Sequence, residues 1–147
     1  MILVVDACVA VKWYVGEPLS DEAQLLLEGD ALLLAPGNVV AEVGHVLVRR
    51  MREGSIGKNH AEAALQGLTK TLTLVPLDEL WEGALSLASE TSVSFYDALY
   101  VAAALRWNAR VVTADERLVR ALAQTSWADR VASLSAFAVK QQVQGPS

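Results

Sequence analysis

ILVVD, residues 2–6, is a run of four apolar residues, three of them β-branched, that ends in a carboxylate. A continuous apolar run of this length predicts a strand that is covered on both faces. An acid directly after such a strand must leave the core at once or find a partner there, because an unpaired buried carboxylate is costly. The run therefore predicts a buried strand and marks its carboxyl end as a candidate site.

Further apolar runs alternate with amphipathic segments along the rest of the chain. Strands are expected over residues 2–6, 31–36, 71–77, 110–113 and 130–134, and helices over 20–29, 38–52, 58–70, 78–90, 96–107 and 115–123. This alternation indicates an α/β fold with a central, mostly parallel sheet of four to five strands and helices on both faces. One domain is expected over residues 1–138, followed by a polar, loose tail over residues 139–147.

The composition limits the class of protein. The 147 residues are 53% hydrophobic and 20% charged, which suits one folded domain with a core. The net charge of −5 means that a nucleic acid must be held by a local site and not by the field of the whole molecule. Cys8 is the only cysteine, which excludes an internal disulfide and a cysteine-rich zinc site.

The first residues are expected to form a strand and not a signal peptide, because they lack a basic start and are soon interrupted by Asp6. Uncharged apolar stretches of about 18 residues or more, the length of a membrane span, are absent from the sequence. A cytoplasmic protein without membrane contacts is therefore expected.

Four carboxylates stand at the ends of expected strands or on the helices next to them. Asp6 ends the first strand, and Glu42 lies in the helix after the second. Asp97 opens the helix that leads into the fourth strand, and Thr113 and Asp115 follow at the end of that strand. Ligand sites of parallel sheets form at the carboxyl ends of the strands, so these residues are candidates for one site.

Each acid also has a purely structural interpretation. Ser94 and Asp97 have the spacing of a helix capping box. Thr113 can cap the helix that follows it, which leaves Asp115 as an ordinary first-turn charge. Glu42 can be a solvated residue on the outer face of its helix.

The joint pattern favours a cation site. Four carboxylates close together repel one another and raise each other's pKa, and the neighbouring segments supply only Lys12 and Arg117 as cations. A divalent ion is the economical partner, and ligands that are all oxygen favour Mg²⁺ or Mn²⁺ over Zn²⁺. The two histidines, His45 and His60, form no spaced pair with a cysteine.

Four segments together resemble PIN-domain ribonucleases, most closely the VapC-type toxins of toxin–antitoxin pairs. They are VVDACVAVKW (residues 4–13), the helix with Glu42, FYDALYVAAA (95–104) and VVTADERL (111–118). The resemblance covers nearly the whole chain. It implies a single PIN-like domain and a metal-dependent endoribonuclease that hydrolyses RNA phosphodiester bonds.

Carried over residue by residue, the resemblance implies an acidic quartet of metal ligands, Asp6, Glu42, Asp97 and Asp115. Asp6 and Asp97 are the central ligands of Mg²⁺ or Mn²⁺, and Asp115 holds a second ion or a water. Glu42 ligates directly or accepts a proton from water. Thr113 joins them in the catalytic set as a hydroxyl that orients a carboxylate or a water. Attack by water implies products with a 5′-phosphate and a 3′-hydroxyl.

The chain departs from the family pattern at two positions. The family commonly has serine two residues after the first acid, where this chain has Cys8, and asparagine three residues after the glutamate, where it has His45. No acid is replaced, so the metal site is expected to survive, while the hydrogen bonds that orient its ligands are expected to differ. Two roles stay open for His45: a proton carrier or phosphate contact, and a packed, hydrogen-bonded residue.

RNA and protein partners follow from the same resemblance. Arg49 is the candidate RNA-binding residue, because it lies about two turns from Glu42 on a similar face and belongs to a basic cluster with Arg50 and Arg52. The alternative for the cluster is a solvated helix end whose cations suit the dipole. The expected protein partners are a VapB-type antitoxin, bound in a groove near the early helices, and a second copy in a homodimer.

Two other classes of protein with acidic residues after the first strand are disfavoured. A haloacid dehalogenase phosphatase needs a second aspartate where Cys8 stands, and a phosphorelay receiver needs an acidic pair where Ala7 follows Asp6. The remaining alternative is a catalytically silent PIN fold that acts as a binding or scaffold module.

Overall fold

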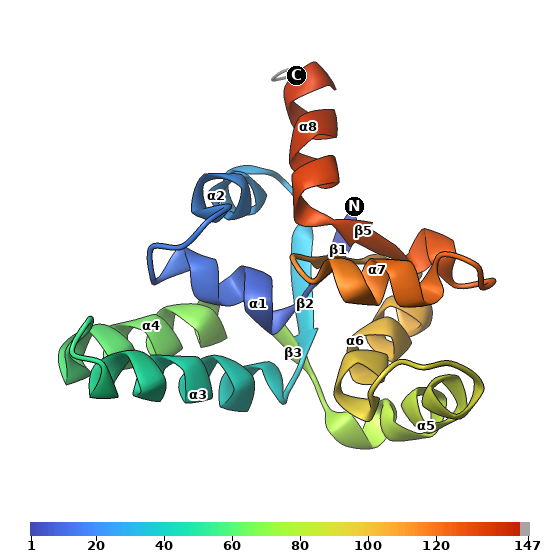
Figure 1. Ribbon diagram of the computed structural model, residues 1–147, viewed down its shortest axis with the longest axis horizontal. Coiled ribbons are helices and arrows are strands. Elements are labelled where there is room, and N and C mark those ends of the chain that lie inside the picture. Colours follow the sequence, from blue (N-terminus) through green and yellow to red (C-terminus); the bar gives the residue numbers. More distant parts are fainter. Residues whose placement is uncertain (145–147) are drawn as a thin grey trace.

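A parallel sheet forms the centre of the protein in the computed structural model, which describes residues 1–144 (Figure 1). Its strands are β1 (Ile2–Val5), β2 (Leu32–Pro36), β3 (Thr73–Val75), β4 (Arg110–Thr113) and β5 (Val131–Ser133). They lie in the order β3-β2-β1-β4-β5, and every neighbouring pair is parallel. The predicted α/β fold is confirmed.

Helices cover both faces of this sheet. They are α1 (Ala7–Ala10), α2 (Ser20–Glu28), α3 (Val39–Arg52), α4 (Lys58–Thr71), α5 (Trp81–Glu90), α6 (Phe95–Arg106), α7 (Glu116–Leu122) and α8 (Leu134–Gln144). Short 3₁₀ turns are η1 (Val11–Trp13), η2 (Leu77–Glu79) and η3 (Ala128–Arg130). Figure 1 shows α1 to α4 on one side of the strands and α5 to α7 on the other. Within residues 1–144 no helix is both long and apolar enough to cross a bilayer.

The central strand and one helix supply the middle of the core. Val4 and Val5 of β1 are fully buried because β1 has a strand on either side and helices on both faces. Every residue of α6 from Ala98 to Ala104 is buried as well, because α6 packs against β1, β2 and β4 on one side and against α5 on the other. A helix that is apolar on all sides fits such an enclosed position.

Two helices are absent from the sequence prediction. One is α1, which with η1 follows directly after Asp6. The other is α8, which crosses the expected boundary at residue 138 and continues to Gln144, so a helix occupies the first part of the expected tail. The rest of that tail, residues 145–147, lies outside the described residues.

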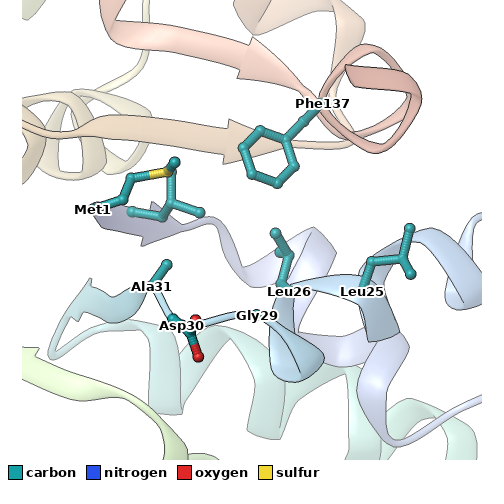
Figure 2. A pocket seen from close by; sticks show the side chains of 8 residues that line it. Met1, Leu25, Leu26, Gly29, Asp30, Ala31 and Phe137 are labelled. Carbon is teal, nitrogen blue, oxygen red and sulfur yellow. The ribbon is translucent and has the colours of Figure 1, made fainter. Parts of the chain in front are cut away.

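The base of α8 closes one end of the molecule. Phe137 of α8, Leu25 and Leu26 of α2, and Met1 surround a small, mostly apolar cavity of about 140 Å³ (Figure 2). The cavity lies beside the amino end of β1, where the chain begins. It therefore sits at the edge of the sheet opposite the expected site.

Candidate active site

The site is built where the course of the chain across the sheet reverses. From β1 the chain moves outward to β2 and β3, and it later returns to β4 and β5 on the other side of β1. Val5 pairs with Val112, so Asp6 and Thr113 follow side by side at the carboxyl ends of β1 and β4. The Asp6 N–H donates to the Val112 carbonyl at 3.1 Å. Parallel sheets place ligand sites at this kind of switch point.

Thr113 holds the first carboxylate of the quartet. Its side chain is fully buried, and Asp6 is only 7% exposed. The Thr113 hydroxyl donates to Oδ2 of Asp6 at 2.7 Å and accepts the Asp115 N–H at 3.0 Å. Thr113 therefore does not cap α7. Asp115 does, since its Oδ1 accepts the Arg117 N–H at 3.0 Å.

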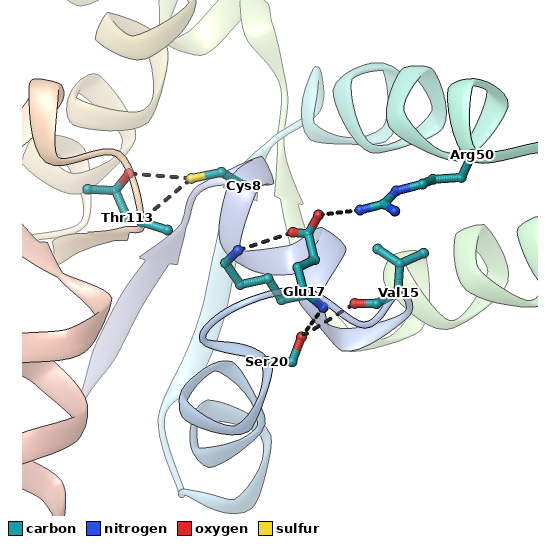
Figure 3. A network of polar contacts seen from close by, with 8 residues as sticks. Cys8, Val15, Glu17, Ser20, Arg50 and Thr113 are labelled. Atoms are coloured by element: carbon teal, nitrogen blue, oxygen red, sulfur yellow. Dashed lines mark hydrogen bonds and ion pairs between the residues drawn. The ribbon is translucent and has the colours of Figure 1, made fainter. Parts of the chain in front are cut away.

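Cys8 takes part in the same hydrogen-bonded group, as Figure 3 shows. Its sulfur lies 3.5 Å from the Thr113 hydroxyl and accepts the Ala114 N–H at 3.4 Å. Burial, and then the nearby charge of Asp6, raise the pKa of the Cys8 thiol to about 12. The residue at the family's serine position is thus a neutral thiol that links α1 to the end of β4.

Glu42 reaches the site from the first turn of α3. Its Oε2 accepts hydrogen bonds from the Tyr100 hydroxyl and from Nδ2 of Asn38, the latter at 3.2 Å. Tyr100 is fully buried in α6. The solvated, outward-facing interpretation of Glu42 is therefore wrong.

Tyr100 is a site residue that the sequence analysis missed. It follows Asp97 by three residues, which places both on the same face of α6. A buried tyrosine hydroxyl usually finds a hydrogen-bond partner, so a tyrosine within this apolar helix was the available signal.

Asp97 both belongs to the helix cap with Ser94 and contributes a carboxylate to the site, the two interpretations that the sequence left open. Its backbone N–H donates to the Ser94 hydroxyl at 3.1 Å, so the predicted helix cap at Ser94 is present. Its carboxylate lines the same pocket as the other three acids. The cap thus fixes the helix end that carries this acid.

All four members of the acidic quartet surround one open pocket of about 240 Å³. Its lining consists of Asp6, Ala7, Cys8, Glu42, Val46, Asp97 and Asp115. Residues from α1, α3, α6 and the segments that directly follow β1 and β4 thus meet at one place. The structure brings the predicted acids together, while their roles in metal binding and catalysis stay predictions.

Burial and mutual repulsion weaken the acidity of three carboxyl groups in the pocket, those of Asp6, Glu42 and Asp97. Burial, and to a smaller extent the charge of Asp97, raise the pKa of Asp6 to about 6, although the Thr113 hydroxyl opposes this. Burial also raises the pKa of Glu42, with Asp6 and Asp97 adding to it, and the pKa of Asp97, with Asp115 adding to it. The site thus holds negative charge that the protein alone compensates poorly.

The donor set fits a hard divalent cation. Within the described residues no group of three or more His, Cys, Asp or Glu side chains is arranged to hold an ion as it stands. Mg²⁺ commonly takes only one or two carboxylates and fills its other positions with water and phosphate oxygens. Lys12 is turned to Glu17 at 3.1 Å, so its charge is engaged away from the quartet. Oxygen ligands with unbalanced charge are what such an ion requires.

Two other candidates lie outside the lining of this pocket. His45 is exposed, so its interpretation as a packed residue is wrong, and its role in proton or phosphate contact stays a prediction. Arg49 has a 58% exposed side chain whose Nε lies 4.0 Å from Glu53, one turn along α3. Its contact with RNA also stays a prediction.

Comparison with known proteins identifies the family. Residues 3–123 match the family model described as "PIN domain". The chain belongs to the PIN-domain family. Ribonuclease VapC1 of Mycobacterium tuberculosis is 33% identical to this PIN domain over 123 residues, which cover 80% of this chain and 89% of the relative. The predicted resemblance to VapC-type PIN domains is confirmed.

Solved structures agree on the fold of this PIN domain. A toxin–antitoxin complex from Klebsiella pneumoniae superposes with a TM-score of 0.64 at 16% identity, covering 90% of this chain and 97% of the other. VapC20 of Mycobacterium tuberculosis, described as a toxin that cleaves the sarcin-ricin loop, gives a TM-score of 0.62 at 21% identity over 79% of this chain and 93% of its own.

Proposed function

We propose that this PIN domain is an endoribonuclease that hydrolyses RNA phosphodiester bonds as the toxin of a toxin–antitoxin pair. The observation that carries the proposal is the pocket at the switch point, which four carboxylates from separate elements surround. A relative named as a ribonuclease, 33% identical over most of both chains, supports the same activity.

Mg²⁺ or Mn²⁺ is the proposed cofactor, held by Asp6 and Asp97 with Asp115 and Glu42 as further ligands. Support comes from the oxygen-only quartet and from the raised pKa values of Asp6 and Asp97, which burial causes in the first place and a neighbouring carboxylate increases. When bound, the ion lowers the pKa of water and stabilises the negative charge that grows on the phosphate during hydrolysis.

The protein's own contribution is to fix these carboxylates. Thr113 donates to Oδ2 of Asp6 and so sets the orientation of that group. Tyr100 and Asn38 hold Oε2 of Glu42. Burial raises the pKa of Glu42, which makes its carboxylate a stronger base toward the attacking water. Attack by water leaves a 5′-phosphate and a 3′-hydroxyl.

Cleavage of labelled RNA by the purified protein tests this function. We expect cleavage in Mg²⁺, none in EDTA, and a loss of at least about a hundredfold in Asp97→Asn, because the variant removes a central ligand. Asp78→Asn is the matched control, since Asp78 is an exposed carboxylate in η2 outside the pocket. Cleavage that persists in EDTA and in Asp97→Asn contradicts the proposal, and end-group analysis tests the predicted products.

Protein partners form the second part of the proposal. The VapC relative and the toxin–antitoxin structure support a VapB-type antitoxin as a partner of this chain. We also infer a homodimer; exposed apolar side chains on α5 and α6, such as Trp81, Leu85 and Leu105, support a protein contact on these helices. Co-expression with a candidate VapB-type antitoxin, expected to be encoded beside this gene, tests the first through inhibition of cleavage. Light scattering of the isolated chain tests the second, since a monomer at all concentrations contradicts it.

A further inference from the structure

A second hollow opens beside the pocket that the acidic quartet surrounds, which is called the catalytic pocket from here on. It has a volume of about 420 Å³ and is lined by Ser92, Val93, Ser94, Asp97, Asp115, Arg117, Leu118 and Ala121. Asp97 and Asp115 line both hollows, so the two spaces adjoin at these two carboxylates. A chain whose phosphate lies in the catalytic pocket therefore has an open place for its next unit.

We propose that this hollow, here called the flanking subsite, binds the nucleoside next to the phosphate that is cleaved, and that Arg117 binds a phosphate of the same RNA. The inference rests on the proposed ribonuclease function and deepens it. It identifies where the substrate lies relative to the acids and which basic residue attracts it.

The walls of the flanking subsite suit a nucleoside. Val93, Leu118 and Ala121 line the hollow, and the small exposed parts of the largely buried Val93 and Leu118 form with Ala121 an apolar floor against which a base or a ribose can lie. Ser92 and Ser94 add hydroxyl groups. The Ser94 oxygen accepts the Asp97 N–H, which leaves its own hydrogen free to donate to a base edge or to a 2′-hydroxyl.

Arg117 is placed to bind phosphate at the border of the two hollows. Its side chain is 85% exposed, and its Nε lies 3.4 Å from Oδ1 of Asp115. An ion pair this exposed and this long is weak, so the guanidinium can turn to a phosphate at small cost. Arginine also matches the geometry of phosphate better than lysine does.

The other cations near the site are less suited to this task. Among the described residues that line the two hollows, Arg117 is the one basic residue. Lys12 and Arg50 both bind Glu17, at 3.1 and 2.9 Å. An acidic chain needs a local cation to hold RNA, and Arg117 supplies it beside the quartet.

Arg117→Gln tests the phosphate contact. We expect KM for an oligoribonucleotide to rise about tenfold with kcat within about twofold, because the contact holds the RNA without touching the reacting atoms. The slope of log(kcat/KM) against log salt should weaken by about 0.7, the effect of one lost phosphate contact on single-stranded RNA. Arg120→Gln is the matched control, because Arg120 is exposed on the same helix and outside both linings.

Ala121→Leu tests the hollow itself, since the larger side chain fills it. We expect a similar rise in KM. An abasic nucleotide at one of the two positions that flank the cut should weaken cleavage by the wild type. The same substrate should cause no further loss of cleavage in Ala121→Leu. Both effects follow from loss of the same base contact.

The outcomes separate this inference from the function on which it rests. Cleavage by the wild type together with unchanged KM in Arg117→Gln and Ala121→Leu overturns the flanking subsite and leaves the ribonuclease intact. Absence of cleavage by the wild type with any RNA in Mg²⁺ overturns both. A rise in KM for Arg117→Gln with an unchanged salt slope shows that Arg117 only offsets Asp115, which also refutes the phosphate contact.

Discussion

Asp6 shows how its surroundings set the proton affinity of a single carboxyl group. The hydroxyl of Thr113 and the thiol of Cys8 favour its charged form, while burial and the charge of Asp97 oppose it. The opposing causes are stronger, so the pKa of Asp6 rises to about 6. At neutral pH the metal-free site therefore carries a charge that costs folding free energy.

This charge makes the stability of the metal-free protein depend on pH in a defined sense. The folded state binds the Asp6 proton more tightly than the unfolded state, so this group's contribution to the free energy of unfolding is largest below about pH 4 and is lost as pH rises through about 6. Asp6→Asn removes that dependence. We compare the free energy of unfolding of the variant with that of the wild type in EDTA. We expect the difference between them to shift in favour of the variant by about 1–3 kcal/mol when the pH is raised from 4 to 7.5.

Urea unfolding of both proteins in EDTA at the two pH values measures this difference. The titration of acids away from the pocket cancels between them, while Glu42 loses the repulsion from Asp6 in the variant and adds to the gain. The same gain at pH 4 as at pH 7.5 would show that the pKa of Asp6 is not raised in the folded protein.

Tyr100 binds the carboxylate of Glu42 through its hydroxyl, so its effect on that group can be tested by a single substitution. Tyr100→Phe keeps the buried ring and removes the hydroxyl that donates to Glu42. A hydrogen bond to a charged group contributes about 1.5–3 kcal/mol, so we expect kcat to fall at least about tenfold when Glu42 loses this donor. KM should change little, because Tyr100 does not line the pocket.

A double-mutant cycle with Glu42→Gln tests whether Tyr100 acts through that residue. In the Glu42→Gln background, Tyr100→Phe should have no further effect on kcat. An equal loss of kcat in both backgrounds would instead point to a general loss of packing, which circular dichroism and the melting temperature would also report.

At the scale of elements, the alternation of apolar runs and amphipathic segments predicted each of the strands β1 to β5, including β4 with only two apolar residues. The bounds of β4 are the predicted ones, 110–113, and the strand ends delivered Asp6 and Asp115 to the expected edge. Helix α1 was missed because it is a single turn with no side-chain cap and continues the apolar pattern of the strand before it. The contact between Tyr100 and Glu42 spans 58 residues and exists only because α3 and α6 meet at this edge.

One ion network joins the segment after α1 to helix α3. Glu17 binds Lys12 at 3.1 Å and Arg50 at 2.9 Å, and these three side chains are 11–27% exposed (Figure 3). The network therefore holds α1 and η1, the segment with Cys8, against α3, the helix with Glu42.

Glu17→Gln should therefore destabilise the protein by about 2–3 kcal/mol, because it leaves two partly buried cations with a neutral partner. Glu53→Gln breaks the exposed pair with Arg49 and serves as the control, with an expected cost below about 0.5 kcal/mol. Urea unfolding measures both. Equal small effects would show that the Glu17 network is as weak as a surface pair.

At the scale of the whole molecule, the order of the strands assembles the site. The chain places α1 to α4 on one face and α5 to α7 on the other, and side chains from both groups line the pocket at the carboxyl ends of β1 and β4 (Figure 1). The quartet draws on both groups, with Glu42 from α3 and Asp97 from α6. No short segment of sequence contains this site, which is why its parts looked structural when each was considered alone.

Because the quartet joins both halves of the fold, an ion bound there should stabilise the whole domain. At a concentration one hundred times its Kd, a ligand that binds only the folded state adds about 2.7 kcal/mol, and a domain of this size gains roughly 2–4 °C in Tm per kcal/mol. We therefore expect saturating Mn²⁺ or Mg²⁺ at pH 7.5 to raise Tm by about 5–10 °C over EDTA at matched ionic strength. In Asp6→Asn/Asp97→Asn the shift should disappear, because two of the proposed ligands and the repulsion between them are gone. A shift of the same size in this double variant would place the ion elsewhere on the protein and remove the quartet as its site.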